Sequence, residues 1–345
     1  MHVEILTTPA AFETLRREWL ELLRQLPTAS VFLTPQWQAT WWHHFGEGYR
    51  LCVVVLRGAD GRLHGLAPLM LALEDHGGGT LTPIGDLEVC DYFDVLLAPE
   101  GRHETATALV CALATTVGDT FTLSLPNLPP QSPTPKVLQT ALLAQGLHVT
   151  LEPIETCPTV ALPRDWETYL QSLRGKDRHE LRRKLRRAAA TARLETYITR
   201  EASRLDGDLD TFFALHRMSR DAAKRGFMTT AKEAFFRDLA HALWPEGWLE
   251  LVFLLADGEP IASLWCLPFG TTYAVYNSGY HPGYAQLSAG IVLFAECIRS
   301  AIARGFQAFD FLRGSEAYKY RFGATDRPLL HLLARTPCPV SEPCV

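Results

Sequence analysis

The sequence lacks a C-x-x-C pair, although it contains eight cysteines, most of them within apolar runs. Reduced thiols in such runs pack as small hydrophobic groups, so we expect neither a zinc ribbon nor a disulfide framework. The sequence also lacks an uninterrupted stretch of the ~20 apolar residues that a membrane span requires, and its N-terminus shows no basic region followed by an apolar one. We therefore expect no membrane span and a cytoplasmic location.

The histidines offer no familiar metal-binding pattern. His43 and His44 are adjacent and lack the i, i+4 spacing that places two imidazoles on one face of a helix. We interpret them as surface or partly buried side chains and expect no metal.

The composition is that of an ordinary globular protein, with 21% charged and 47% hydrophobic residues. Because 345 residues exceed what one core usually spans, we expect two domains. Residues 1–160 carry a net charge of −9 and the remainder +4. We place the boundary where CPTVALPRDW leads into a helix capped by Asp165, giving domains 1–160 and 161–345.

Both halves follow the same order of elements. In the first, a strand His2–Leu6 and helices ending with Pro35–Phe45 precede a hairpin around Ala59-Asp60-Gly61, and further strands and two helices follow. In the second, helices precede three strands joined by D-G and F-G turns, then a helix, a strand and a last strand near Leu329–Arg335. The pattern predicts a duplicated α/β (α+β) fold, in which helices lead into an antiparallel meander and then a β-α-β crossover.

The segment with the clearest chemistry runs from Tyr273 to Lys319. A strand, a Gly-containing turn and a helix that starts near Ser288 place unpaired backbone N–H groups at a helix N-terminus, which attracts phosphate. Ser288 fits the N-cap, while Ala289 and Gly290 leave room for a bulky anion. A plain capped helix is the alternative interpretation. Five polar residues follow after the next strand: Asp310, Arg313, Glu316, Tyr318 and Lys319.

Chains with this order of motifs resemble the GNAT acyltransferase superfamily, in particular the CelD-like acetyltransferase domain associated with cellulose biosynthesis. The resembling motifs are an S-x-G helix start, here Ser288-Ala289-Gly290, and D-F-x-x-G-x-x-x-Y-K, here Asp310 to Lys319. FLTPQWQATWWHHFG, the CPTVALP entry and LRGKDRHELRRKLRRA extend the resemblance over nearly the whole chain. The usual phosphate loop, Q/R-x-x-G-x-G/A, differs here because the glycine after Gln286 comes one place late.

The resemblance implies tandem GNAT-like domains related to Fem-type transferases. Acetyl-CoA or another acyl-CoA is then the co-substrate of the C-terminal domain, held by Gln286, Ser288, Ala289 and Gly290. The N-terminal domain, without a comparable loop, is expected to shape the acceptor site.

Transfer of an acyl group to an amine requires donors for an oxyanion, a base for the amine and an acid for the thiolate. Tyr318 stands where GNAT enzymes often place the acid; packing or hydrogen bonding is its alternative role. Asp310 and Glu316 are candidate bases, with His281 a third, although Glu316 fits a helix cap equally well. Arg313 and Lys319 are expected to hold a phosphate or carboxylate by charge.

Acidic residues gather in the first half within GDLEVCDYFD, which includes Asp91. They either orient a cationic amine acceptor or form a solvated loop. Among the tryptophans of the helix Pro35–Phe45, which fit a core or cleft wall, Trp41 joins Asp91 as a candidate acceptor contact.

Residues 174–193 are expected to form a strongly basic helix in which Leu181, Leu185, Ala188 and Ala192 make one apolar stripe. Its cations have three possible interpretations. They form a solvated helix face, they bind an anionic substrate or the acidic first domain, or they contact nucleic acid. The acidic chain argues against nucleic acid, but tRNA stays an alternative because Fem relatives use aminoacyl-tRNA.

The sequence is compatible with three functions, which experiment has to distinguish. They are an N-acyltransferase acting on an amine of a small molecule, sugar or polysaccharide precursor; a Fem-like aminoacyl transferase; and a non-catalytic accessory protein of polysaccharide biosynthesis. The sequence leaves the acceptor, the acyl length and the oligomeric state open.

Overall fold

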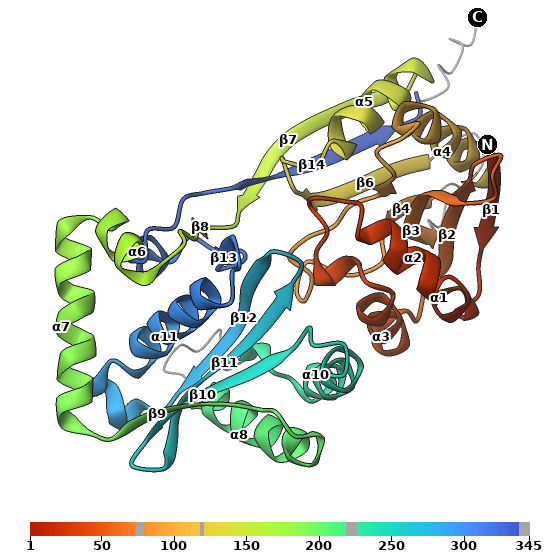
Figure 1. Cartoon of the computed structure of the whole chain (residues 1–345). Coiled ribbons are helices and arrows are strands. Elements are labelled where there is room, and N and C mark those ends of the chain that lie inside the picture. Colours follow the sequence, from red (N-terminus) through yellow and green to blue (C-terminus); the bar gives the residue numbers. More distant parts are fainter. Residues whose placement is uncertain (74–78, 118–120, 219–225, 338–345) are drawn as a thin grey trace, which may run out of the picture. The chain divides into compact units, whose positions relative to one another are not determined.

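The computed structural model describes residues 1–73, 79–117, 121–218 and 226–337 (Figure 1). Cys338, Cys344 and residues 219–225 lie outside them. The six described cysteines are free thiols. None of the described helices is both long and apolar enough to cross a membrane.

The chain forms two compact units. The first comprises Met1–Glu155 together with the C-terminal segment from Pro328, and the second comprises Thr156–Arg327. The expected division between residues 160 and 161 differs from these units most at the C-terminus. There the last strand joins the first unit instead of the second.

The first unit contains an eight-stranded sheet in the order β1-β2-β3-β4-β6-β14-β7, with β5 paired to β3. Its strands are β1 (His2–Leu6), β2 (Arg50–Arg57), β3 (Leu63–Leu73), β4 (Gly79–Pro83), β5 (Leu96–Leu97), β6 (Phe121–Leu128), β7 (His148–Thr156) and β14 (Pro328–Arg335). Its helices are α1 (Ala10–Thr14), α2 (Arg16–Leu23), η1 (Val31–Leu33), α3 (Pro35–Phe45), α4 (Arg102–Val117) and α5 (Thr134–Ala144).

The predicted local signals explain several of these elements. Helix α3 has the predicted bounds, with Pro35 in its first turn and the Thr34 side chain accepting a hydrogen bond from the Trp37 amide. Helix α4 connects β4 to β6, which run parallel, so the first unit contains the predicted β-α-β crossover. Strand β14 pairs antiparallel with β6, and its Leu332 and Ala334 are fully buried in the core of this unit.

The second unit contains a six-stranded sheet in the order β8-β13-β12-β11-β10-β9. Its strands are β8 (Thr159–Ala161), β9 (Leu194–Ile198), β10 (Glu250–Ala256), β11 (Glu259–Phe269), β12 (Thr272–Tyr280) and β13 (Ala308–Asp310). Its helices are α6 (Trp166–Ser172), α7 (Gly175–Thr191), η2 (Ala202–Arg204), α8 (Leu205–Arg217), α10 (Thr230–Leu243), η3 (Pro282–Leu287), α11 (Ala289–Ala303) and α12 (Ala317–Arg321).

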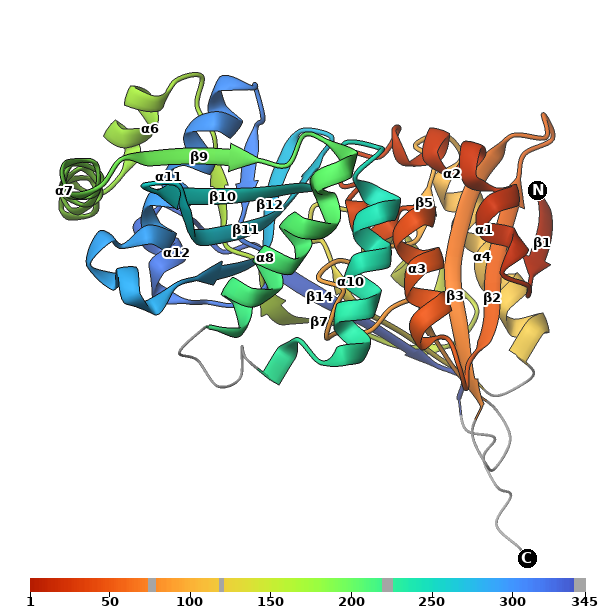
Figure 2. The ribbon, with the colours of Figure 1, turned by 90° about the horizontal axis from the view of Figure 1, so that it is seen from below.

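Helices cover both faces of this sheet, with α8 and α10 on one side and α11 on the other (Figures 1 and 2). Successive residues of β11 show the alternation: Trp265 packs on Phe212 of α8, whereas the Cys266 thiol contacts Cys297 of α11. Helix α11 connects the parallel strands β12 and β13 and so repeats the crossover of the first unit. Two mainly antiparallel sheets flanked by helices confirm the predicted fold class.

Candidate active site

The strands β12 and β13 stay together over only three residue pairs, from Thr272 with Ala308 to Ala274 with Asp310. Strand β12 continues to Tyr280, while its pairing with β11 extends along nearly its whole length. The two parallel strands therefore separate after Ala274, which opens one edge of β12 beside the start of the crossover helix.

A bulge in β12 marks the same place. Trp265 lies opposite Asn277 and the next residue, Cys266, lies opposite Val275, so Tyr276 is the extra residue on β12. A bulge turns backbone groups out of the ladder and increases the local twist. The sequence showed no signal for it, since no glycine stands at this position.

The turn after β12 leads into the N-terminus of α11. Ser288 occupies the N-cap position, as expected, but it adopts a left-handed conformation with φ of 54° and makes no side-chain capping bond. The Val292 amide donates to the Ser288 carbonyl, so the amides of the three residues before it have no acceptor within the helix. A Cβ on Gly290 would meet nothing within 4 Å, whereas Ala289 is buried and Gln286 is exposed.

Arg187 of the basic helix α7 reaches this helix start. Its Nη2 donates to Oγ of Ser288 over 3.0 Å. A guanidinium and the positive end of a helix dipole repel each other, and an anion between them is stabilised by both. The two constellations that the sequence suggested separately thus meet at Ser288.

The rest of α7 is attached to the second unit as predicted. Leu181 and Ala188 are buried in its core, and Leu185 and Ala192 pack against it. Several cations of the helix are paired on the surface, as in Arg183 with Glu180 at 2.8 Å.

Hydrogen bonds from Lys319 hold the turn after β13, which differs from the expectation that Lys319 binds a phosphate or carboxylate. The Lys319 side chain is 3% exposed, and its Nζ donates to the carbonyl oxygens of Leu312, Arg313 and Gly314 at 3.1, 2.7 and 2.9 Å. It also lies 2.9 Å from Glu316. Since an ammonium has three N–H groups, Lys319 fixes the turn and has no proton left to offer a phosphate.

The two candidate bases take part in the same turn. Asp310 is buried, and its Oδ1 accepts a hydrogen bond from the Leu312 amide over 2.8 Å, which supports the left-handed Leu312. Glu316 is exposed at the start of α12 without a capping bond, and it pairs with Lys319. Arg313 is half-buried beside them.

Tyr318 packs its ring against Phe294 of α11, with centroids 5.4 Å apart, and against Phe311. Burial, and to a smaller extent Glu316, raises the pKa of this phenol well above its usual range. The hydroxyl therefore keeps its proton at neutral pH. His281 lies at the start of η3, where its Nδ1 accepts a hydrogen bond from the Gly283 amide over 3.1 Å.

The expected acceptor contacts in the first unit are core residues. Trp41 is 2% exposed and its indole N–H donates to Asp86 over 2.8 Å, while Asp91 is 7% exposed. Neither presents a surface to a substrate in this structure. Phe93, which is also buried, donates its amide to the Asn127 carbonyl beside the end of β6. The segment after β4 thus packs into its own unit, in contrast to the open start of α11.

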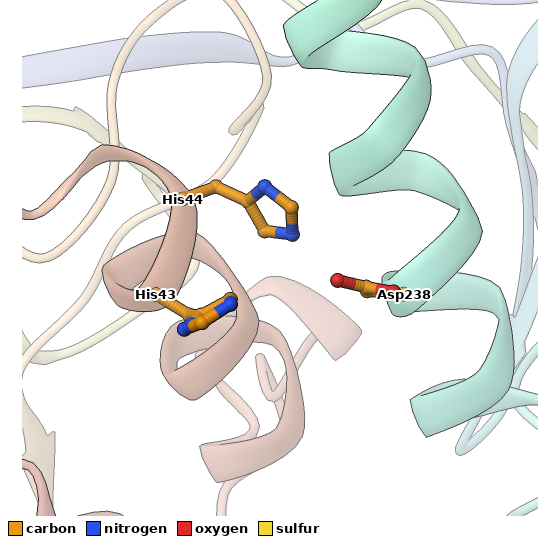
Figure 3. Close-up of side chains that lie close together, drawn as sticks. All are labelled: His43, His44 and Asp238. Atoms are coloured by element: carbon orange, nitrogen blue, oxygen red, sulfur yellow. The ribbon is translucent and has the colours of Figure 1, made fainter.

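Figure 3 shows the adjacent histidines of α3, together with Asp238, which belongs to α10 of the second unit. The rings of His43 and His44 meet edge to face, with centroids 5.1 Å apart. His43 is exposed and His44 half-buried, which agrees with the predicted surface or partly buried positions.

We compared the sequence and the fold with those of known proteins. Residues 175–320, from α7 to α12, match the family model of the acetyltransferase (GNAT) domain. No curated protein matches the sequence. Among solved structures, FemX has a TM-score of 0.65 at 12% identity, covering 96% of this chain and 97% of that chain. L-PGS from Bacillus licheniformis has a TM-score of 0.57 at 12% identity, covering 94% of this chain and 93% of that chain.

At these identities the structural likeness concerns the fold alone. The separated strands, the bulge and the open helix start all lie within the matched range. The second unit of this chain therefore contains the region that matches the acetyltransferase (GNAT) domain model, within a two-unit fold that is similar to that of FemX.

Proposed function

We propose that this chain is an N-acyltransferase that moves an acetyl or longer acyl group from acyl-CoA to an amine. The observation that carries the proposal is the convergence of the α11 N-terminus, Arg187 and the separated strands β12 and β13 within one unit. Phosphate, thioester and amine each need a different chemical environment, and the proposal assigns each of them to a separate part of this site.

The pyrophosphate of coenzyme A fits the start of α11. The amides of Ala289, Gly290 and Ile291 supply N–H donors, and the helix dipole and Arg187 supply positive charge. The open space above Gly290 lets a bulky anion approach the backbone. Gln286, exposed one turn earlier, is the proposed side-chain contact.

The thioester is proposed to lie where β12 leaves β13. Backbone N–H groups around the Tyr276 bulge would bind the acyl oxygen and stabilise the negative charge that develops on it. Tyr318 keeps its proton and so can donate it toward the departing thiolate, although its raised pKa makes it a weaker acid than an exposed phenol.

The base is proposed to come from Asp310, Glu316 or His281. Asp310 and Glu316 already hold the turn after β13, so each would act as a base only by exchanging a present partner. Because Nδ1 of His281 accepts the Gly283 amide, a neutral His281 carries its proton on Nε2, so it too would act as a base only by exchanging a present partner. Arg313 is proposed to attract an anionic group of the acceptor.

The acceptor is proposed to be a small-molecule, sugar or polysaccharide-precursor amine, following the CelD-like order of motifs. In this scheme the first unit shapes the acceptor side, but through residues other than Trp41 and Asp91, which are buried.

Binding of the donor tests the proposal. We expect acetyl-CoA to raise the melting temperature of the full chain, and the Arg187→Gln variant to weaken that binding about tenfold or more. Arg186→Gln, one residue away, is the matched control and should bind as the wild type does. No stabilisation by acetyl-CoA or free coenzyme A would remove the donor from the scheme.

A Fem-like transferase that uses aminoacyl-tRNA is the second candidate. The basic helix α7 and the fold similarity to FemX favour it. This function predicts tRNA binding that falls steeply with salt, since phosphate contacts release counterions. A chain that binds neither acetyl-CoA nor tRNA would fit a non-catalytic accessory protein.

A further inference from the structure

A groove lies on the α11 side of the second unit, away from the start of that helix. Its floor comprises Ile198 of β9, Val252 of β10 and Tyr273 of β12, and its volume is about 360 Å³. This volume is within the range of small-molecule pockets. None of the roles proposed above uses it.

One stripe of α11 forms the facing wall. Glu296, Arg299, Ser300 and Ala303 follow each other at intervals of three, one and three residues, so they share one helical face. Ser300 and Ala303 are small, which is why the sheet and the helix do not close against each other here. About 15 Å of helix separates Arg299 from the residue that begins α11.

The buried carboxylate of Glu250 lies outside the lining of the groove and is already satisfied. Glu250 is 5% exposed and accepts hydrogen bonds from the Tyr273 hydroxyl and from Arg304 Nη1, both at 2.9 Å. Arg200 contributes a third, longer contact to the other carboxylate oxygen at 3.4 Å. Tyr273 therefore presents its ring, and not a free hydroxyl, to the groove.

The residues that line the groove carry one cation and one carboxylate, Arg299 and Glu296. Arg299 is exposed, lines the groove and forms no ion pair within the described part of the chain. Arg304 and Arg200, in contrast, are occupied by Glu250. Arg299 is thus the cation available to a ligand, and the hydroxyls of Ser300 and Thr196 line the same groove.

We propose that this groove binds a small amphipathic anion, a monocarboxylate with an aliphatic body. The aliphatic body would lie on Ile198, Val252 and the Tyr273 ring, and the carboxylate would pair with Arg299. The inference does not depend on acyl-CoA as the donor, because the groove and the α11 N-terminus use different residues.

Isothermal titration calorimetry of the full chain with octanoate tests the proposal, with octylamine and acetate as comparisons. Octylamine keeps the chain and reverses the charge, while acetate keeps the charge and lacks the chain. We expect binding of octanoate and, at the same concentrations, neither of the others. No binding of octanoate, or equal binding of octylamine, would overturn the proposal.

Three variants locate the site. Arg299→Gln should weaken octanoate binding about tenfold or more, and Glu296→Gln should strengthen it, because the first removes an attraction and the second a repulsion. Ala303→Trp fills the groove from an exposed helix position and should abolish binding. Octanoate binding that survives Ala303→Trp, or that Arg299→Gln leaves unchanged, contradicts the assignment. Acetyl-CoA binding, measured on the same variants, should stay as in the wild type.

Discussion

Replacing Lys319 separates a structural role from a ligand-binding one. In Lys319→Met the side chain keeps its length and apolar body but loses the ammonium. The carbonyl oxygens of Leu312, Arg313 and Gly314 then stay buried without their present donor. Hydrogen bonds from a charged group contribute about 1.5–3 kcal/mol each, and the three share one ammonium whose own desolvation offsets part of the gain.

We therefore expect Lys319→Met to lower the free energy of unfolding by about 3–5 kcal/mol. For a unit of the size of Thr156–Arg327, this corresponds to a decrease in the melting temperature on the order of 10 °C. Differential scanning calorimetry would measure it, with Arg321→Met on the same helix as the control. A variant that melts like the wild type but no longer binds acetyl-CoA would refute this reasoning and restore Lys319 as a ligand-binding residue.

Four further substitutions have expected outcomes. Burial raises the pKa of Asp94 to about 7, so the folded state favours the protonated form and loses stability as the pH rises from about 4 through 7. Asp94→Asn should remove this dependence and be more stable than the wild type at pH 8, by at most about 4 kcal/mol, in melting curves at pH 5 and 8. Gly279→Ala should cost about 1–3 kcal/mol in urea unfolding, because a Cβ would lie 2.6 Å from the His216 amide nitrogen. Gly290→Ala has open space and should stabilise α11 by up to about 1 kcal/mol, yet weaken acetyl-CoA binding in calorimetry. Tyr318→Phe should lower turnover at least about 100-fold and leave acetyl-CoA binding unchanged; unchanged turnover would exclude it as the acid.

Elements with strong local signals were predictable from the sequence. The capped helix Pro35–Phe45 has the predicted bounds. The predicted apolar stripe of α7 packs into the core of its unit. The hairpin turn at Asp257-Gly258 is another, since both residues adopt positive φ as a D-G turn requires.

Long-range pairing was not predictable in the same way. The strand Pro328–Arg335 looked like the end of the second half, because sequence periodicity records which face of a strand is buried and not which sheet supplies its neighbours. Likewise, Lys319 and Trp41 are of residue types that often bind ligands. The structure shows instead that Lys319 donates to backbone carbonyl oxygens and that Trp41 donates to Asp86. The contact of Arg187 with Ser288 joins residues 101 positions apart, so neither the basic helix nor the Ser288 helix start could predict it alone.

Hydrogen exchange at the start of α11 tests the central claim most directly. Exchange would be followed by mass spectrometry on a peptide that covers η3 and the first residues of α11, with and without coenzyme A. We expect coenzyme A to slow exchange of the amides of Ala289, Gly290 and Ile291, which have no acceptor within the helix, and the Arg187→Gln variant to lose this protection. Unchanged exchange at these amides under saturating coenzyme A would contradict the proposed donor site.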